Sequence, residues 1–319
     1  MNKLVGNTPM IKIKYRYRGI EKEVYVKLEQ YNLTGSIKDR IALYIIEEEK
    51  KNNNLKDNMP IIEATSGNTG ISFSSIGAKL KHPVYIFMPN WVSKERIKLI
   101  ESFGAKVTLV SKEEGGFKEC IRRADVLSKK IRGYRPNQFS NYLNTKCHYT
   151  TTGKEIESNL KGEKIGGFVS GIGSGGTLMG IGKRLKEAYP DILIGAVEPS
   201  KMALLTSGKI SNHKIEGIGD DFIPELLDVK IIDKVFDIDD DDAINMARII
   251  SRDLGLGVGI SSGANFIGAV LLGDNTDNPV VTIFPDDNKK YLSTQLTDKI
   301  NLKKEFVSNN VKLISYETI

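Results

Sequence analysis

Short, β-rich apolar segments alternate with longer helix-type segments along most of this chain of 319 residues. This order constrains the fold, because a chain that returns to begin a new parallel strand needs a crossover, which is usually a helix. We therefore predict an α/β protein with two open, twisted, mostly parallel sheets and helices on both faces of each. The predicted strands are 23–28, 59–63, 84–88, 106–110, 167–170, 192–197 and 279–284. The predicted helices are 38–51, 70–80, 93–103, 116–131, 177–188, 241–254 and 263–272.

Composition and charge exclude several classes of protein. The 40% hydrophobic and 27% charged residues are ordinary for a globular protein in water. Lys and Arg number 46 against 40 Asp and Glu, and this small, evenly spread excess favours anionic ligands over nucleic acid. Cys120 and Cys147 form no metal-binding spacing, and the first residues contain no apolar core of a signal peptide. We expect a cytoplasmic protein with reduced thiols and no metal.

A lysine stands at the start of the first predicted helix, in the segment NLTGSIKDR at 32–40. The positive end of a helix dipole disfavours the ammonium form of Lys38, so the pKa of this lysine should be lowered. A lysine that forms Schiff bases needs such a lowered pKa. The alternative is a surface lysine that pairs with Asp39.

Two glycine-containing polar loops join predicted strands to helices, at 65–70 (TSGNTG) and 171–177 (GIGSGGT). Parallel sheets bind their ligands at such loops. Hydroxyls, an amide side chain and free N–H groups at a helix start can hold a carboxylate in the first loop, although a simple N-cap is the alternative. In the second loop, glycines let the backbone approach a phosphate closely.

The second loop also fits the dinucleotide pattern GxGxxG, through Gly171, Gly173 and Gly176. Glu198 ends the next strand, at the position of the ribose-binding acid in such folds. A nicotinamide or flavin enzyme therefore stays open on local grounds, but it gives no role to the first two segments. A pyridoxal-phosphate enzyme uses all three, as a lysine for the aldehyde, a cradle for the substrate carboxylate and a cradle for the phosphate.

Ten segments in order resemble the cysteine synthase and cystathionine β-synthase family, of the tryptophan-synthase-β-like pyridoxal phosphate fold. The resemblance covers roughly residues 4 to 294. The matching segments are LVGNTPM (4–10), NLTGSIKDR, TSGNTG, QFSN (138–141), HYTTTGKEI (148–156), GIGSGGT, VEPS (197–200), EGIGDDFIP (216–224), GISSGA (259–264) and KYLST (290–294).

The resemblance implies a role for each matching residue. Lys38 forms the Schiff base and moves the α-proton, Asn68 bonds the ring hydroxyl of the cofactor, and Ser261 faces its pyridine nitrogen. The implied ligands of the substrate carboxylate are Thr65, Ser66, Thr69 and Gln138, and those of the phosphate are Gly173, Ser174, Gly175, Gly176 and Thr177.

The resemblance also implies the reaction and the organisation of the chain. The expected chemistry is loss of a β-substituent to give an aminoacrylate, followed by addition of a nucleophile. We expect a small, mobile, substrate-binding domain at 35–146, a large phosphate-binding domain from 1–34 plus 147–319, and pyridoxal phosphate in the cleft between them. Family members are usually homodimers, and some bind serine acetyltransferase. A pyridoxal-binding partner or sensor protein without activity is the non-enzyme alternative, which the presence of Lys38 disfavours.

Asp220 and Asp221 depart from the cysteine synthase pattern, which has small residues there. Cystathionine β-synthases resemble this chain in having an aspartate at the place of Asp221. At about 5 Å and an effective dielectric near 20, such a charge opposes an incoming anion by about 3 kcal/mol. We therefore predict that Asp221 is a general base for water or a thiol, and that L-cysteine is the substrate, losing hydrogen sulfide to give serine or a thioether such as lanthionine. The alternatives are a cysteine synthase that uses O-acetylserine and sulfide, and a cystathionine β-synthase.

Overall fold

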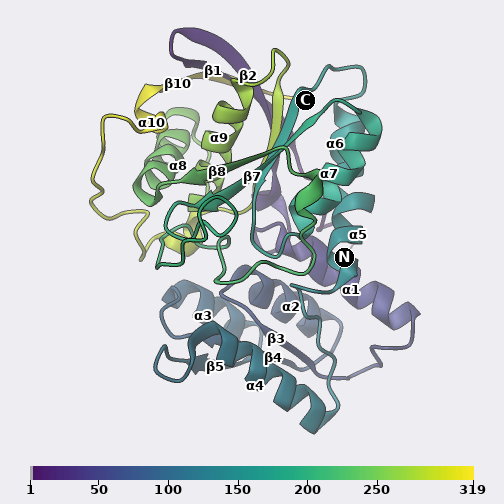
Figure 1. Cartoon of the computed structure of the whole chain (residues 1–319). Helices are drawn as coiled ribbons and strands as arrows, with labels where there is room; N and C mark the ends of the chain where they lie inside the picture. The colour runs from purple at the N-terminus through teal and green to yellow at the C-terminus, as the bar shows by residue number, and fades with distance from the viewer. Residues whose placement is uncertain (1–2) are drawn as a thin grey trace.

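The computed structural model describes residues 3–319, which form one sheet of seven strands and one of three (Figure 1). The strands of the larger sheet are β1 (Met10–Tyr17), β2 (Ile20–Leu28), β6 (Gly167–Gly171), β7 (Leu193–Pro199), β8 (Lys234–Ile238), β9 (Val280–Phe284) and β10 (Val311–Thr318). Their spatial order is β10-β1-β2-β9-β6-β7-β8. From β2 to β8 all neighbours are parallel, whereas β1 runs antiparallel to both β2 and β10.

The smaller sheet consists of β3 (Ile61–Ala64), β4 (Val84–Pro89) and β5 (Lys106–Val110), all parallel. Its strands have helices on both sides, α2 (Asn68–Lys79) and α3 (Lys94–Ser102) with one apolar cluster and α4 (Gly116–Ile131) with another. In Figure 1 this sheet and its helices lie below the larger sheet.

Three helices pack directly on the larger sheet, α7 (Gly176–Ala188), α8 (Asp240–Leu254) and α9 (Ile260–Gly273). Helix α1 (Lys38–Lys51) packs against α2 and shares the apolar cluster of the smaller sheet. The other helices are α5 (Tyr142–Thr150), α6 (Thr152–Asn159) and α10 (Val307–Asn310), with short 3-10 turns at Glu29–Tyr31, Val229–Ile231 and Asn288–Tyr291. Nearly every residue of α9 is buried, because this helix packs against α8 on one side and against β6 and β9 on the other. No helix of residues 3–319 is long and apolar enough to span a membrane.

The predicted fold class is confirmed, and the bounds of α1, β5 and α4 match their predicted ranges. The sequence analysis did not assign β1, β8, β10, α5 or α6. The C-terminal segment pairs with its own chain, because β10 extends the larger sheet beside β1 with Tyr17 opposite Val311. The division into a small domain at 35–146 and a large domain stays a prediction.

Candidate active site

A pocket lies where the first turns of four helices, α1, α2, α7 and α9, face one another. Eleven of the predicted site residues line it, namely Lys38, Thr65, Ser66, Asn68, Thr69, Gln138, Gly173, Ser174, Gly175, Thr177 and Ser261. The amino end of a helix carries partial positive charge and free N–H groups, so four such ends favour an anionic ligand. The structure thus brings together segments from all along the chain into what we call the active-site pocket.

Lys38 is the first residue of α1, and its ammonium group faces this pocket. Burial lowers the pKa of Lys38 to about 8, while the charge of Asp220 acts in the opposite direction. We predicted a lowered pKa from the helix dipole, whereas the cause found in the structure is burial. A larger fraction of unprotonated amine near neutral pH makes this lysine a better nucleophile and proton acceptor than an ordinary one.

The loop before α7 forms a cradle of unused backbone donors. The amides of residues 173–177 make no hydrogen bond to any protein atom among residues 3–319. A side chain at Gly173 would overlap the carbonyl of Gly217, since its Cβ would lie 2.5 Å from that oxygen. Close backbone approach and free amides at a helix start are what a phosphate group requires. Gly176 stands just behind this surface, packed against Asn144.

The loop before α2 forms a second polar cradle. The Thr69 hydroxyl donates to Gln138 Oε1 at 2.7 Å, so these two predicted carboxylate ligands contact each other. Asn68 donates from Nδ2 to Asp286 at 2.7 Å, which leaves its Oδ1 buried and without a partner among the described residues. A buried oxygen without a hydrogen bond costs free energy, so Asn68 Oδ1 is placed to accept one from a ligand.

Two residues of α5 support both cradles, and the sequence analysis gave neither a role. Asn144 donates to the Gln138 carbonyl at 2.8 Å and to the Ser174 hydroxyl at 2.9 Å, which ties the two loops together. One turn later, the ring of His148 lies 3.3 Å from the Thr177 hydroxyl and 3.0 Å from that of Thr152. Their spacing of four residues on one helix face was a signal that could have been noticed.

His148 is fully buried, and burial together with the charges of Lys38 and Arg40 holds its pKa well below the usual range. A neutral imidazole donates from one nitrogen and accepts at the other. When the Thr177 hydroxyl donates to an anion, Nε2 must donate to Thr177 and Nδ1 must accept from Thr152. His148 therefore fixes the direction in which the Thr177 hydroxyl points.

We expect His148→Leu to weaken binding of the phosphate-bearing ligand about fivefold, because one hydrogen bond of the cradle is worth about 1 kcal/mol. His148→Gln, which can still reach Thr177 with its amide, should recover most of this loss. Equilibrium dialysis of each purified protein with the phosphate-bearing ligand measures both changes in affinity. Equal affinity in the Leu variant and the unmodified protein would show that His148 does not position Thr177.

Arg96 of α3 closes one side of the active-site pocket. Its guanidinium forms an ion pair with Glu216 and lies over the ring of Tyr291, 4.7 Å from the ring centre. It also packs so closely on Gly67 that a side chain at that position would overlap it. Arg96 thus joins the smaller sheet to segments of the larger one across the edge of the pocket.

The adjacent aspartates face different spaces. Asp220 lines the active-site pocket, and burial raises its pKa to about 6, with Lys38 opposing and Asp221 adding to the shift. Asp221 does not line this pocket. Its carboxylate pairs with Lys118 at 2.9 Å and lines an adjoining space of about 600 Å³, which we call the outer hollow. Asp220 lines both spaces, so an acidic group stands at the passage between them.

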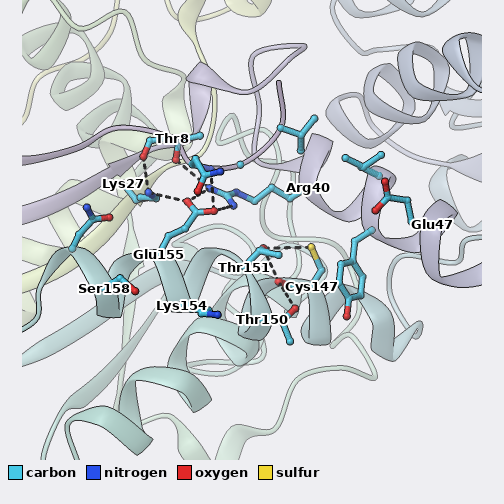
Figure 2. Close-up of a pocket in the computed structure, with 16 residues that line it drawn as sticks. Thr8, Lys27, Arg40, Glu47, Cys147, Thr150, Thr151, Lys154, Glu155 and Ser158 are labelled. Atoms are coloured by element: carbon cyan, nitrogen blue, oxygen red, sulfur yellow. Dashed lines mark hydrogen bonds and ion pairs between the residues drawn. The ribbon is translucent and has the colours of Figure 1, made fainter. Parts of the chain in front are cut away.

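The segments LVGNTPM and TTGKEI do not line the active-site pocket. They contribute residues to a buried ion network instead. Arg40, two residues after Lys38, binds Glu29 through Nε at 2.6 Å. It also binds Glu155 through Nη1 at 2.6 Å (Figure 2). Lys27 pairs with Glu155 at 2.9 Å and donates to the Thr8 carbonyl at 2.6 Å. This network lines a second cavity of about 630 Å³ beside α1 and holds the first turn of α1 in place.

Glu198 has a structural role in this chain, whereas the dinucleotide pattern required it to bind a ribose. Its buried carboxylate accepts hydrogen bonds from the amides of Leu205 and Thr206 and from the Thr206 hydroxyl, at 2.7 to 3.0 Å. These bonds hold the segment after β7. Cys120 and Cys147 are free and buried, and burial raises the pKa of each thiol to about 12, so both are unreactive.

Comparison with known proteins gives consistent matches. Residues 1–286 match the family model described as pyridoxal-phosphate dependent enzyme. A hydrogen sulfide-producing enzyme of Fusobacterium nucleatum is similar in structure, with 48% identity, a TM-score of 0.96, and coverage of 100% of this chain and 98% of that one.

Two further relatives extend the comparison. An aspartate-to-asparagine variant of that enzyme, complexed with an α-aminoacrylate intermediate, is 49% identical with a TM-score of 0.96, over 98% of this chain and 96% of that one. The cysteine synthase of Staphylococcus aureus is 37% identical over 93% of this chain and 96% of its own length.

Proposed function

Since this chain belongs to the pyridoxal-phosphate-dependent enzyme family, within the cysteine synthase group, we propose that its substrate is L-cysteine. The enzyme acts at the β-carbon of an amino acid, by elimination or replacement of the β-substituent. On our proposal the group that leaves is hydrogen sulfide, and water or a second thiol takes its place to give serine or a thioether such as lanthionine. The observation that carries the proposal is the acidic pair Asp220 and Asp221 at the passage into the pocket.

The residues of the pocket fit pyridoxal phosphate. Free amides at 173–177 suit the phosphate, and the unpartnered Asn68 Oδ1 suits the ring hydroxyl. Lys38 is in place for the aldehyde, and Ser261, buried at the start of α9, is our candidate for the ring nitrogen. A neutral hydroxyl at that nitrogen, in place of a carboxylate, leaves the ring a weaker electron sink and favours elimination over transamination.

When bound, the cofactor supplies the electron sink that makes loss of the α-proton possible. Lys38 is placed to accept that proton, because its amine has a lowered pKa and faces the pocket. The substrate carboxylate is assigned to Thr65, Ser66, Thr69 and Gln138. On this assignment we propose that the β-carbon of the bound amino acid faces Asp220, which lines the same pocket.

Two carboxylates at the entry oppose a nucleophile whose reacting atom is charged, such as hydrosulfide, and favour a neutral thiol or water that must lose a proton. We assign the general base to Asp221, which faces the outer hollow from which a nucleophile arrives. Asp220 is the alternative base, supported by its place in the pocket beside Lys38. The relative complexed with an α-aminoacrylate has one aspartate replaced by asparagine, and we take this as support for an aspartate as the base in our proposal.

The test is incubation of the purified, cofactor-loaded protein with L-cysteine alone, with assays for sulfide and mass spectrometry of the organic product. We expect rapid sulfide release with serine or lanthionine as product. Asp221→Asn should slow steady-state release about a hundredfold, the usual size of general-base catalysis. Release at the original rate in this variant would remove Asp221 from the mechanism.

Asp220→Asn serves as the matched comparison. If Asp220 is the base, the rate rises with pH through about 6, where its raised pKa lies, and the rise disappears in Asp220→Asn. If Asp221 is the base, Asp220→Asn lowers activity much less than Asp221→Asn does. The two variants therefore assign the base to one carboxylate or the other.

A cysteine synthase that joins O-acetylserine and sulfide is the second candidate, favoured by the match to the Staphylococcus aureus enzyme. A cystathionine β-synthase is the third, favoured by the aspartate at 221. Fast cysteine formation from O-acetylserine and sulfide, with no sulfide from L-cysteine, would establish the second candidate. Cystathionine formed from homocysteine would establish the third.

The family resemblance supports three finer proposals. We propose that the chain works as a homodimer, that it acts in the cytoplasm, and that residues 35–146 move as a small domain over the pocket. The separate three-stranded sheet with its own apolar clusters supports the last of these. A complex with serine acetyltransferase belongs to the cysteine synthase alternative. Analytical ultracentrifugation, alone and with the acetyltransferase, measures both assemblies.

A further inference from the structure

The outer hollow contains a positive charge that the protein does not pair. Three lysines line it, Lys112, Lys118 and Lys214. Lys118 pairs with Asp221 at 2.9 Å, and Lys214 pairs with Asp241 at 3.5 Å. Lys112 forms no ion pair with any carboxylate of residues 3–319.

Other contacts hold the Lys112 ammonium at the hollow. It lies over the ring of Trp91, 5.2 Å from the ring centre, and donates to Asn212 Oδ1 at 3.3 Å. Trp91 comes from the segment between β4 and α3, and Asn212 from the long segment after β7, so both sides of the hollow contribute. An ammonium has three N–H donors, and Asn212 uses one. Two donors remain for an anion in the hollow.

Lys112 lies where part of the second substrate would extend when its thiol reaches the passage beside Asp220. Lys112 lines the outer hollow but not the active-site pocket, whereas Asp220 lines both. A molecule that places its thiol at the passage beside Asp220 extends its remaining atoms into the hollow. The volume of about 600 Å³ is ample for an amino acid. Hydrosulfide and water have no second group that could bind Lys112 while their sulfur or oxygen lies at the passage.

We propose that Lys112, held over Trp91, binds the carboxylate of the incoming thiol, so that the enzyme prefers a carboxylate-bearing thiol such as a second cysteine as its nucleophile. This inference rests on the proposed function, and it selects the thioether over serine as the main product. The C–S bond of the first cysteine breaks, and the sulfur of the second bonds to the same carbon. The thiol proton passes through the acidic pair to the departing sulfide, so two cysteines give one thioether and one hydrogen sulfide.

A competition between two thiols tests this inference. The cofactor-loaded enzyme receives L-cysteine with equal concentrations of 3-mercaptopropionate, which has a carboxylate, and 2-mercaptoethanol, which has none. Mass spectrometry gives the ratio of the two mixed thioethers. We expect the carboxylate-bearing product to dominate at low salt. Lys112→Ala should lower the ratio about tenfold, the size of one charge-assisted hydrogen bond, and Lys112→Arg should preserve it.

Lys98→Ala is the matched control, because it removes one exposed lysine of α3 that does not line the hollow, and it should leave the ratio unchanged. An unchanged ratio in Lys112→Ala, or no preference in the unmodified enzyme, overturns the inference. The first burst of sulfide from L-cysteine tests the proposed function separately. If that burst is absent, O-acetyl-L-serine replaces cysteine as first substrate, and the same ratio still decides the role of Lys112.

Discussion

Replacing Lys38 by alanine is expected to lower turnover of L-cysteine by at least about a thousandfold. Lys38 is the basic group in the pocket that is placed to take the α-proton, and general acid–base catalysis contributes about 10²- to 10⁴-fold. The same change removes the amine that holds the cofactor aldehyde, so both contributions disappear together. Stopped assays of sulfide over hours measure the remaining rate.

The fold should survive the change, because the Lys38 side chain makes no ion pair in the described part of the chain and Ala favours a helix. Lys51→Ala is the matched control, since Lys51 ends the same helix and pairs with Glu48 on the surface. The visible absorption band of the bound cofactor should shift in Lys38→Ala and stay in place in Lys51→Ala. Appreciable turnover by Lys38→Ala with unchanged absorption would show that another residue has the role given to Lys38.

The parallel part of the fold could be predicted because its pattern is local. Each buried strand there is short and apolar, and polar or glycine-containing loops mark most passages into helices. The strand β1 also has a clear signal, with Ile11, Ile13, Tyr15 and Tyr17 buried at every second position, which the sequence analysis did not use. For β10 the signal is weak, since only Val311 and Leu313 of its eight residues are buried at the edge of the sheet.

The sequence analysis could predict the residues that line the active-site pocket, but not the residues that support them from behind. Asn144 and His148 act through other residues, and their roles depend on how α5 packs beneath the start of α7. Asp220 and Asp221 are neighbours, so spacing alone could not show which one would line the pocket. Their different surroundings come from Lys118 and Lys38, which are distant in the sequence.

Arg40→Met is expected to lower the free energy of unfolding by about 3–5 kcal/mol, the usual effect of breaking a buried ion pair. Arg40 and Glu29 are both buried, and the change leaves the Glu29 carboxylate with hydrogen bonds from Thr8 and Asn32 but with no cation. Urea unfolding followed by circular dichroism measures the loss. Arg122→Met is the matched control on the exposed face of α4, where loss of the pair with Glu119 should cost less than about 1 kcal/mol.

Adding Glu29→Gln to Arg40→Met should restore part of the lost stability, because it removes the uncompensated carboxylate while keeping its shape.

Unfolding at low pH gives a second measurement of the same network. Burial raises the pKa of Glu155, but Arg40 and Lys27 outweigh burial and bring it down to about 2. A carboxyl with a lowered pKa stabilises the fold above its ordinary value near 4.5, and this contribution is lost as the pH falls towards 2. In Arg40→Met the contribution of Glu155 should be smaller and should be lost at higher pH. An unchanged acid unfolding profile would mean that Arg40 does not support the first turn of α1 through Glu155.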